Sequence, residues 1–167
     1  PNTGTLLQQR LDIHGCPAFS LETACSGFVY ALSVADKFVR LGEAKCALVV
    51  GVECLSRFVD WTDRSTCVLF GDGAGAVVLT PAEEPGIIAT HLHSDGKYKD
   101  LLYFPYGVSS GFDKLRNNST EGLKMLGNEV FKVAVRTLSR LVDETLAKNG
   151  VERGDIDWLI PHQANLR

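Results

Sequence analysis

Residues 21–32 have the sequence LETACSGFVYAL, which places one cysteine where an extended chain turns into a helix. The preceding run, residues 18–23, alternates enough to predict a short strand. From Ser26 to about Leu41 the chain is apolar nearly all round, which is typical of a buried helix, and Gly42 is expected to end it. A strand followed by a buried helix is typical of an α/β fold.

The rest of the chain continues this alternation. Residues 46–54 (CALVVGVEC) form a β-branched run that predicts a central strand covered on both faces. Residues 128–148 have the apolar spacing of an amphipathic helix, closed by Asn149-Gly150. We also expect a helix over residues 5–13, strands over 66–70, 74–79, 86–91 and 157–160, and a long irregular segment over 94–120. The sequence therefore predicts a mixed α/β fold with a largely parallel sheet.

Composition excludes several classes of protein. The 167 residues carry a formal charge of -3, which does not support nucleic-acid binding, and their number suits one sizeable core. No apolar run has the length of a membrane span, and no signal peptide is visible. The five cysteines form an odd set without a C-x-x-C pair, so zinc ligation and a disulfide framework both fit poorly. A reducing, cytoplasmic setting is the simplest interpretation.

Both ends of the chain look like cuts in a longer protein. Pro1 is not an initiator methionine, and a new element is expected to begin at residues 162–167, HQANLR. Helix followed by strand, with a chemically interesting residue at a strand end, also occurs twice, near Cys25 and near His162. We therefore expect a piece of a protein that has a loose internal repeat.

Cys25 is the first candidate for chemistry. A thiol at the first turn of a helix lies beside unpaired backbone N–H groups and the positive end of the helix dipole, and both favour the nucleophilic thiolate. Apolar burial opposes this, so such a site needs a partner such as a histidine. The alternative is that Cys25 is a small core residue, the interpretation we prefer for Cys46, Cys54 and Cys67.

His162 is the second candidate, because it follows Pro161 directly after a predicted strand. Ligands of open α/β sheets gather beyond the carboxyl ends of strands, so an imidazole there can face a cleft. Gln163, Ala164 and Asn165 could open a helix beside it. The alternative is a structural histidine at the end of a strand.

The glycine-rich run at residues 70–79, FGDGAGAVVL, formally satisfies a dinucleotide-binding pattern. That pattern works only when a helix follows, since the helix N-terminus holds the pyrophosphate. Here Val77, Val78 and Leu79 follow, which are typical of a strand, and Asp72 would lie among the phosphates. A tight turn between two strands is the better interpretation.

Four separated motifs together resemble a known family. The motifs are ACSGF at 24–28, DRSTCVLFGDGAGAVVL at 63–79, GNEVFKVAV at 127–135 and WLIPHQANLR at 158–167. In this order they closely resemble β-ketoacyl-acyl-carrier-protein synthase III, a condensing enzyme. The resemblance implies a thiolase-like fold of two similar α/β halves in a homodimer. It places residues 1–92 at the end of the first half and residues 93–167 at the start of the second, with both halves incomplete.

The resemblance also implies a reaction. Cys25 would accept the acetyl group of acetyl-CoA as a thioester, and malonyl-acyl-carrier protein would then lose carbon dioxide and attack it. His162 matches the histidine that donates to the thioester oxygen, where negative charge develops. The family's catalytic asparagine, on a G-N-T loop, has no counterpart in this chain. Asn165 instead matches a contact to the pantetheine arm.

Further binding residues follow from the same motifs, and neither a cofactor nor a metal is implied. Arg64 matches a residue near the nucleotide end of coenzyme A, where a guanidinium suits a phosphate or a base. Phe70, Met125, Gly127 and Phe131 match residues that bind the substrate. Carrier-protein docking is implied for Lys132 and Arg167, and also weighed for Arg136 and Arg140. Their alternatives are a salt bridge for Arg64, ordinary core for the apolar side chains, and a solvated face with Arg140 paired to Glu144 for the cations.

Three functions stay open at this point. The leading one is an acyltransferase that initiates fatty acid synthesis from acetyl-CoA, or a relative that uses another acyl-CoA starter. The second is a chain that folds or pairs without turnover, because the asparagine loop is missing. The third is a nucleotide-binding module built on residues 71–76.

Overall fold

The computed structural model describes residues 1–84, 86–107 and 122–163. The chain forms two compact units: Pro1–Gly51 with Gly75–Leu92, and Val52–Ala74 with His93–Arg167. The change at Leu92 coincides with the boundary expected between the two halves, but the segment Val52–Ala74 belongs to the second unit. The division into family halves stays a prediction.

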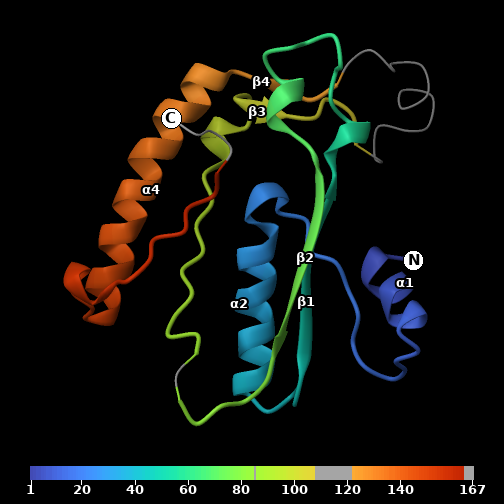
Figure 1. The fold of residues 1–167 in the computed structure, drawn as a ribbon, viewed down its shortest axis with the longest axis vertical. Coiled ribbons are helices and arrows are strands. Elements are labelled where there is room, and N and C mark those ends of the chain that lie inside the picture. The colour runs from blue at the N-terminus through green and yellow to red at the C-terminus, as the bar shows by residue number, and fades with distance from the viewer. Residues whose placement is uncertain (85, 108–121, 164–167) are drawn as a thin grey trace. The chain divides into compact units, whose positions relative to one another are not determined.

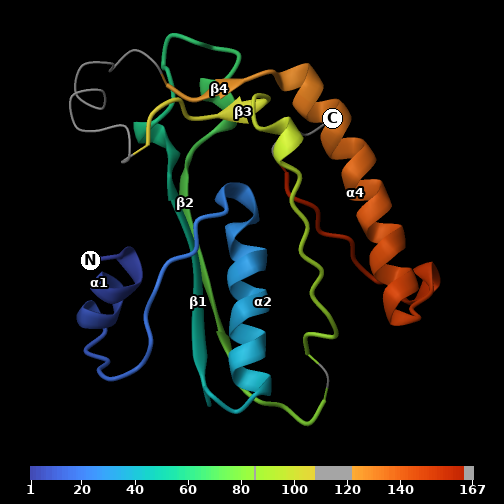
Figure 2. The same cartoon turned by 180° about the vertical axis from the view of Figure 1, so that it is seen from behind.

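The first unit contains two helices and most of a strand pair. α1 (Thr3–Arg10) begins where the Asn2 side chain accepts a hydrogen bond from the Thr5 backbone N–H. α2 (Gly27–Arg40) confirms the central predicted helix. β1 (Ala47–Cys54) is hydrogen-bonded to β2 (Asp72–Leu79), and α2 lies along this pair (Figures 1 and 2). The start of α2 packs against β1 at Gly51, where an added Cβ would be in ordinary van der Waals contact, at 3.5 Å, with the Phe28 side chain.

The buried face of α2 is polar, contrary to the prediction of a helix buried nearly all round. Ser33 and Asp36 are the buried residues of α2, whereas Val29 is 49% exposed. The Ser33 hydroxyl lies 2.7 Å from that of Thr90, and Arg40 donates to the Ile87 carbonyl oxygen. Polar contacts therefore hold α2 against an extended segment, residues 86–92. This segment covers the side of α2 that carries Ser33 and Asp36.

Asp36 is the centre of this attachment. Its carboxylate accepts from Lys37 Nζ at 2.8 Å and from Arg40 Nε at 2.7 Å. The hydrogen bond from Lys37, followed by that from Arg40, lowers the pKa of Asp36. Because the folded-state pKa lies below the unfolded value of about 3.9, the stabilisation is present above that pH and is lost as pH falls through the folded-state pKa.

We expect Asp36→Asn to lower the free energy of unfolding at pH 7 by about 1–2 kcal/mol, because two charge-assisted hydrogen bonds are weakened. The loss should shrink as pH falls below about 4 towards the lowered pKa of folded Asp36, where the wild-type carboxylate becomes protonated. Urea unfolding at both pH values measures this. Asp12→Asn is the matched control, since the Asp12 side chain is 93% exposed. Equal urea midpoints for Asp36→Asn and wild type at pH 7 would contradict the assignment.

The second unit contains a long helix and a short hairpin-like pair. β3 (Leu102–Tyr103) pairs antiparallel with β4 (Lys124–Met125), with Leu102 opposite Met125 and Tyr103 opposite Lys124. α4 (Gly127–Asn149) begins two residues later and ends at Gly150, whose φ of 62° is the left-handed conformation that closes helices. This confirms the amphipathic helix and its predicted cap. Single 3-10 turns occur at Leu55–Arg57, Cys67–Leu69, Gly96–Tyr98 and Arg153–Asp155.

The core of the second unit forms around Val59, Thr66 and Cys67, all of which are buried. Beside it, the Phe58 and Phe104 rings meet edge to face at 5.3 Å, and Tyr106 continues the row at 6.4 Å from Phe104. Edge-to-face pairs of this kind add stabilisation beyond the area they bury. The aromatic row therefore joins the loop after β1 to the chain that follows β3.

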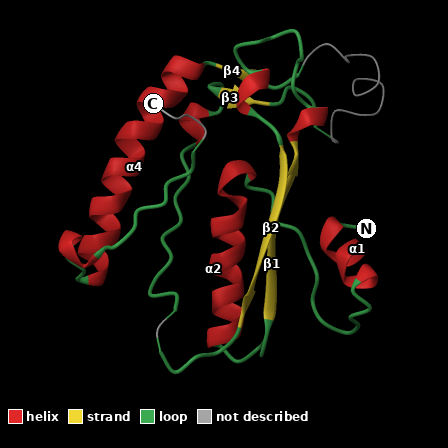
Figure 3. Ribbon diagram, viewed as in Figure 1, coloured by secondary structure: helices red, strands yellow, loops and turns green. Residues whose placement is uncertain are grey.

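Several predicted strands are wrong, although the α/β class is confirmed. Residues 66–70 are not a strand but contain the 3-10 turn Cys67–Leu69, in which the Leu69 N–H donates to the Thr66 carbonyl oxygen. Three other predicted strands are not formed, at residues 18–23, 86–91 and 157–160, since these residues have no ladder partner in the described part of the chain (Figure 3). β1 was expected to be covered on both faces, but Val49 is its one buried residue. The part of the irregular segment 94–120 that falls on 108–120 lies outside the described residues.

None of the helices in the described ranges is both long enough and apolar enough to cross a membrane.

Candidate active site

Cys25 lies in a 3-10 turn, Ala24–Ser26, that runs directly into α2. Ala24 has φ 46°, in the left-handed region that side chains other than glycine seldom adopt. The turn is closed by the Ser26 N–H, which donates to the Thr23 carbonyl oxygen at 3.2 Å. Backbone strain of this kind often marks a functional position. The strained residue here, Ala24, directly precedes Cys25.

The thiol of Cys25 is free and exposed, which does not fit the alternative of a core residue. Its position at the start of a 14-residue helix places it near unpaired backbone N–H groups and the positive end of the helix dipole. A nucleophile that attacks a carbonyl carbon suits this position. Cys46 and Cys54, which were expected in the core, are also exposed, whereas Cys67 is buried as predicted.

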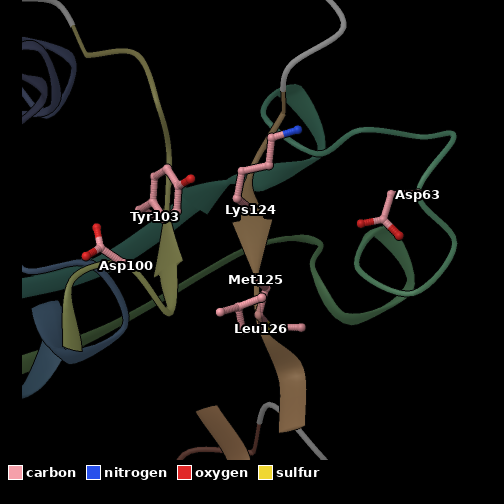
Figure 4. Close-up of a pocket in the computed structure, with 6 residues that line it drawn as sticks. All are labelled: Asp63, Asp100, Tyr103, Lys124, Met125 and Leu126. Atoms are coloured by element: carbon pink, nitrogen blue, oxygen red, sulfur yellow. The ribbon is translucent and has the colours of Figure 1, made fainter. Parts of the chain in front are cut away.

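A pocket of about 330 Å³ lies in the second unit. It is lined by three stretches of chain: Asp63 from the loop after β1, Asp100 and Tyr103 from the β3 region, and residues 124–126 from β4 and the turn into α4 (Figure 4). Met125 in this lining is one of the predicted substrate-binding residues. Asp63 directly precedes Arg64, a second predicted substrate-binding residue, which is exposed. The fold thus brings the start of the motif at residues 63–79 to the same cavity as Met125.

The loop that carries Arg64 is held rigidly by two carboxylates. Asp60 accepts from the Thr62 N–H at 2.9 Å and its hydroxyl at 2.6 Å, and Asp63 accepts from the Ser65 N–H at 3.0 Å and its hydroxyl at 2.6 Å. These side-chain bonds, from Thr62 and from Ser65, are the main causes that lower the pKa of Asp60 and of Asp63. Both groups therefore stay ionised at neutral pH and keep the turn in one conformation.

Gly122 permits the close approach that positions β4 beside this loop. A Cβ at Gly122 would lie 2.3 Å from the Asp60 backbone nitrogen and 2.8 Å from the Phe58 carbonyl oxygen. The Leu123 N–H donates to that same oxygen at 2.8 Å. These contacts are with backbone atoms, which cannot move aside as a flexible side chain does.

We expect Gly122→Ala to lower the free energy of unfolding by about 1–3 kcal/mol, because the methyl group must push the two backbone segments apart. Thermal or urea unfolding measures the change. The matched control is Gly96→Ala, in the same unit, where nothing lies within 4 Å of the added Cβ. An unchanged midpoint for Gly122→Ala would show that the two segments are not in this contact.

The other predicted substrate-binding residues do not line this pocket. Gly127 opens α4, where a Cβ would meet the Met125 side chain at 3.6 Å. Phe131 lies one turn further along α4 and is 40% exposed, and Phe70 is half-buried at the end of the 3-10 turn Cys67–Leu69. Their role at a substrate stays a prediction.

His162 is exposed and follows Pro161. Cys25 belongs to the first unit and His162 to the second, so their meeting at one centre is part of the functional proposal. The predicted contacts Asn165 and Arg167 lie outside the described residues.

The polar face of α4 consists largely of ion pairs. Lys132 binds Glu129 at 2.8 Å, and Arg140 pairs with Glu144 at 3.8 Å, as the solvated-face alternative predicted. Glu144 also binds Lys148 at 2.6 Å and His93 at 3.2 Å. The hydrogen bond from Lys148, helped by His93 and Arg140, lowers the pKa of Glu144. Arg140 is thus accounted for by local charge pairing.

The glycine-rich run is a strand and not the start of a helix. β2 covers Asp72–Leu79, which confirms that no helix follows the glycines, although the tight turn expected at residues 71–73 is wrong because Asp72 and Gly73 are already in the strand. The Asp72 carboxylate accepts from the Ser56 N–H at 2.8 Å and hydroxyl at 2.7 Å. A carboxylate held this way is not arranged to bind a pyrophosphate.

Sequence reasoning missed Asp100, Tyr103 and Lys124 in the pocket. Asp100 and Tyr103 lie in the segment expected to be irregular, and two-residue strands such as β3 and β4 leave no readable periodicity. Long ordered loops often carry function, and that was the one available signal. In the described part of the chain, no group of three or more histidines, cysteines or carboxylates is placed to hold a metal ion.

The comparisons with known proteins agree with the family that the motifs indicated. The family model described as 3-Oxoacyl-[acyl-carrier-protein (ACP)] synthase III matches residues 19–96. Curated proteins named Beta-ketoacyl-[acyl-carrier-protein] synthase III match the whole chain, at 62% identity in Thioalkalivibrio sulfidiphilus (52% of its length) and 64% in Xanthomonas campestris (51% of its length). The chain thus spans about half the length of the curated relatives it matches.

Solved structures give the same picture. The 3-oxoacyl-[acyl-carrier-protein] synthase III of Aquifex aeolicus superposes with a TM-score of 0.86 at 46% identity, covering 99% of this chain and 50% of that one. The priming β-ketosynthase of the R1128 polyketide pathway superposes with a TM-score of 0.89 at 33% identity, covering 99% of this chain and 49% of that one.

Proposed function

This chain belongs to the 3-oxoacyl-[acyl-carrier-protein] synthase III family and has part of its thiolase-like α/β fold, and on this basis we propose that the protein condenses an acyl-CoA starter, acetyl-CoA, with malonyl-acyl-carrier protein. The product is acetoacetyl-acyl-carrier protein, the first intermediate of fatty acid synthesis. The observation that carries the proposal is the exposed, free thiol of Cys25 in the strained turn that opens α2.

In the first step the Cys25 thiolate attacks the thioester carbonyl of acetyl-CoA. The new S–C bond forms, the bond to the coenzyme sulfur breaks, and free coenzyme A leaves with the proton. The N-terminus of α2 supports this step because its backbone N–H groups favour the negative sulfur. The result is an acetyl thioester on Cys25.

In the second step malonyl-acyl-carrier protein loses carbon dioxide, and the electron pair left on its α-carbon attacks the acetyl thioester. Expulsion of the Cys25 thiolate completes the transfer. Loss of carbon dioxide is difficult because negative charge develops on the malonyl thioester oxygen. His162 donates a hydrogen bond to that oxygen. The second donor of the family, an asparagine on a G-N-T loop, does not occur in these 167 residues.

Substrate binding completes the proposal. Arg64 holds the nucleotide end of coenzyme A, Asn165 the pantetheine arm, and Phe70, Met125, Gly127 and Phe131 the remainder of the substrate. Lys132 and Arg167 dock the acidic carrier protein. The reaction needs neither metal nor cofactor, and we place the protein in the cytoplasm as a homodimer.

The alternative within the family is a relative with another acyl-CoA starter. The likeness to the R1128 priming ketosynthase is the observation behind it, but that identity is 33%, against 62% for the curated synthase III of Thioalkalivibrio sulfidiphilus. We therefore prefer acetyl-CoA.

The direct test is to incubate the protein that carries this chain with malonyl-acyl-carrier protein and a series of acyl-CoA starters. We expect acetoacetyl-carrier and carbon dioxide in equal amounts, with acetyl-CoA giving the highest kcat/KM. A higher kcat/KM for a longer or branched starter would select the alternative. A folded protein that forms no β-ketoacyl product from any starter would contradict the proposal.

A further inference from the structure

Asp72 ties together the two ends of the loop between β1 and β2. Its carboxylate accepts from the Ser56 N–H at 2.8 Å and from the Ser56 hydroxyl at 2.7 Å, although 16 positions separate the two residues. The Ser56 carbonyl oxygen accepts in turn from Trp61 Nε1 at 3.2 Å. The hydrogen bond from the Ser56 hydroxyl, followed by that from its N–H, lowers the pKa of Asp72, so the carboxylate is ionised at neutral pH. Two charge-assisted hydrogen bonds, which are stronger than neutral ones, therefore join Ser56 to Asp72.

Little packing supports the chain on either side of Asp72. Gly71 and Gly73 flank it, and nothing lies within 4 Å of a Cβ added to either glycine. Asp72 and the next six residues of β2 are exposed. Glycines also leave the backbone free to take several conformations. The hydrogen bonds to Ser56, together with the ladder between β1 and β2, therefore fix where the start of β2 lies.

Phe70 lies between this anchor and the core of the second unit. It directly follows the 3-10 turn Cys67–Leu69, in which Cys67 is buried. On its other side, Gly71 alone separates it from Asp72. Phe70 is half-buried, so part of it can meet a ligand. Because burial fixes the turn before it, the freedom of Phe70 depends on how firmly Asp72 is held.

We propose that Asp72 is a positioning residue that sets which acyl-CoA starter the protein prefers. It acts through Phe70, a predicted substrate contact, so the inference rests on the proposed function. An apolar pocket distinguishes ligands that differ by one methylene group by about 10–200-fold. A pocket side chain that its surroundings do not hold loses part of that discrimination. Loosening the link between Ser56 and Asp72 should therefore widen the range of accepted starters without stopping the reaction.

The competing explanation is that these hydrogen bonds only stabilise the fold. A purely stabilising contact changes the fraction of folded protein, which lowers the rates with all starters equally. The ratio of kcat/KM for two starters does not depend on how much active protein is present. This ratio therefore separates the two explanations, even for a variant that folds poorly.

The experiment measures kcat/KM for acetyl-CoA and for butyryl-CoA, with malonyl-acyl-carrier protein, in the protein that carries this chain. For Asp72→Ala we expect the ratio of acetyl-CoA to butyryl-CoA to fall by about fivefold to tenfold, because both hydrogen bonds are lost. Ser56→Ala removes only the hydroxyl bond and should cause a smaller fall in the same direction. Ser56→Thr keeps a hydroxyl and should keep the wild-type ratio.

Asp95→Ala is the matched control and should leave the ratio unchanged. Asp95 also accepts from a backbone N–H in the second unit, that of Lys97 at 3.2 Å. Wild-type ratios for Asp72→Ala and Ser56→Ala, whatever their rates, would overturn the inference alone, and so would an equal change for Asp95→Ala. Failure of the proposed function looks different: folded wild type would form no β-ketoacyl product from either starter, which would overturn both.

Discussion

Cys25→Ala is expected to abolish condensation, with at least about a thousandfold loss of acetoacetyl-carrier formation. No other group in the proposed mechanism accepts the acetyl group from acetyl-CoA. The loss should appear in kcat and not in the stability of the protein. Alanine suits a 3-10 turn as well as cysteine does, and Cys25 is exposed, so little packing is removed. Steady-state assay of the β-ketoacyl product measures the effect.

The control for this variant is Cys46→Ala, which removes another exposed thiol of the first unit. We expect it to keep wild-type kcat. Equal activity of Cys25→Ala and Cys46→Ala would mean that the thiol at the start of α2 is not the nucleophile. A Cys25→Ala variant that retains the wild-type urea midpoint rules out unfolding as the cause of lost activity.

His162→Ala should separate the two half-reactions. Acetylation of Cys25 does not use the enolate donor, so it should stay near the wild-type rate, whereas condensation should fall by about 10²–10³-fold. His162→Gln retains a side-chain N–H donor and is expected to lose less. Rapid-quench measurement of acetyl transfer, followed by malonyl-carrier addition, resolves both steps.

His14→Ala is the matched control, because His14 is an exposed histidine paired with Asp12 in the loop after α1. It should leave both half-reactions unchanged. If His162→Ala slowed acetylation and condensation equally, the imidazole would act on Cys25 itself and not on the malonyl thioester. If it changed neither, His162 would have no catalytic role.

The helices α2 and α4 and the strand β1 could be predicted from the sequence, because their signals are local. α4 shows a clear apolar period and ends at a glycine that takes the left-handed conformation, and β1 is a β-branched run. The partner with which a strand forms hydrogen bonds is not a local signal, because it lies elsewhere in the sequence. Residues 157–160 look like a strand, yet Trp158, Leu159 and Ile160 are 83%, 66% and 86% exposed and no described segment pairs with them.

The candidate site also contains residues that local motifs reveal and residues that only the pairing of distant segments reveals. Cys25 and Arg64 stand in contiguous motifs and could be named from the sequence. Asp100, Tyr103 and Lys124 could not, because a pairing of two-residue strands brings them together. The polar buried side of α2 was missed for a related reason. In the sequence Ser33 and Asp36 only interrupt an apolar run, and their burial depends on Thr90 and Ile87, which lie far along the chain.

The most direct test of the central claim is mass spectrometry of the peptide that contains Cys25 after brief incubation with acetyl-CoA alone. We predict one acetyl group on Cys25, lost again when malonyl-acyl-carrier protein is added. A folded protein whose Cys25 peptide stays unmodified, or whose acetyl group is found on Cys54 instead, would contradict the assignment of this chain as a condensing enzyme.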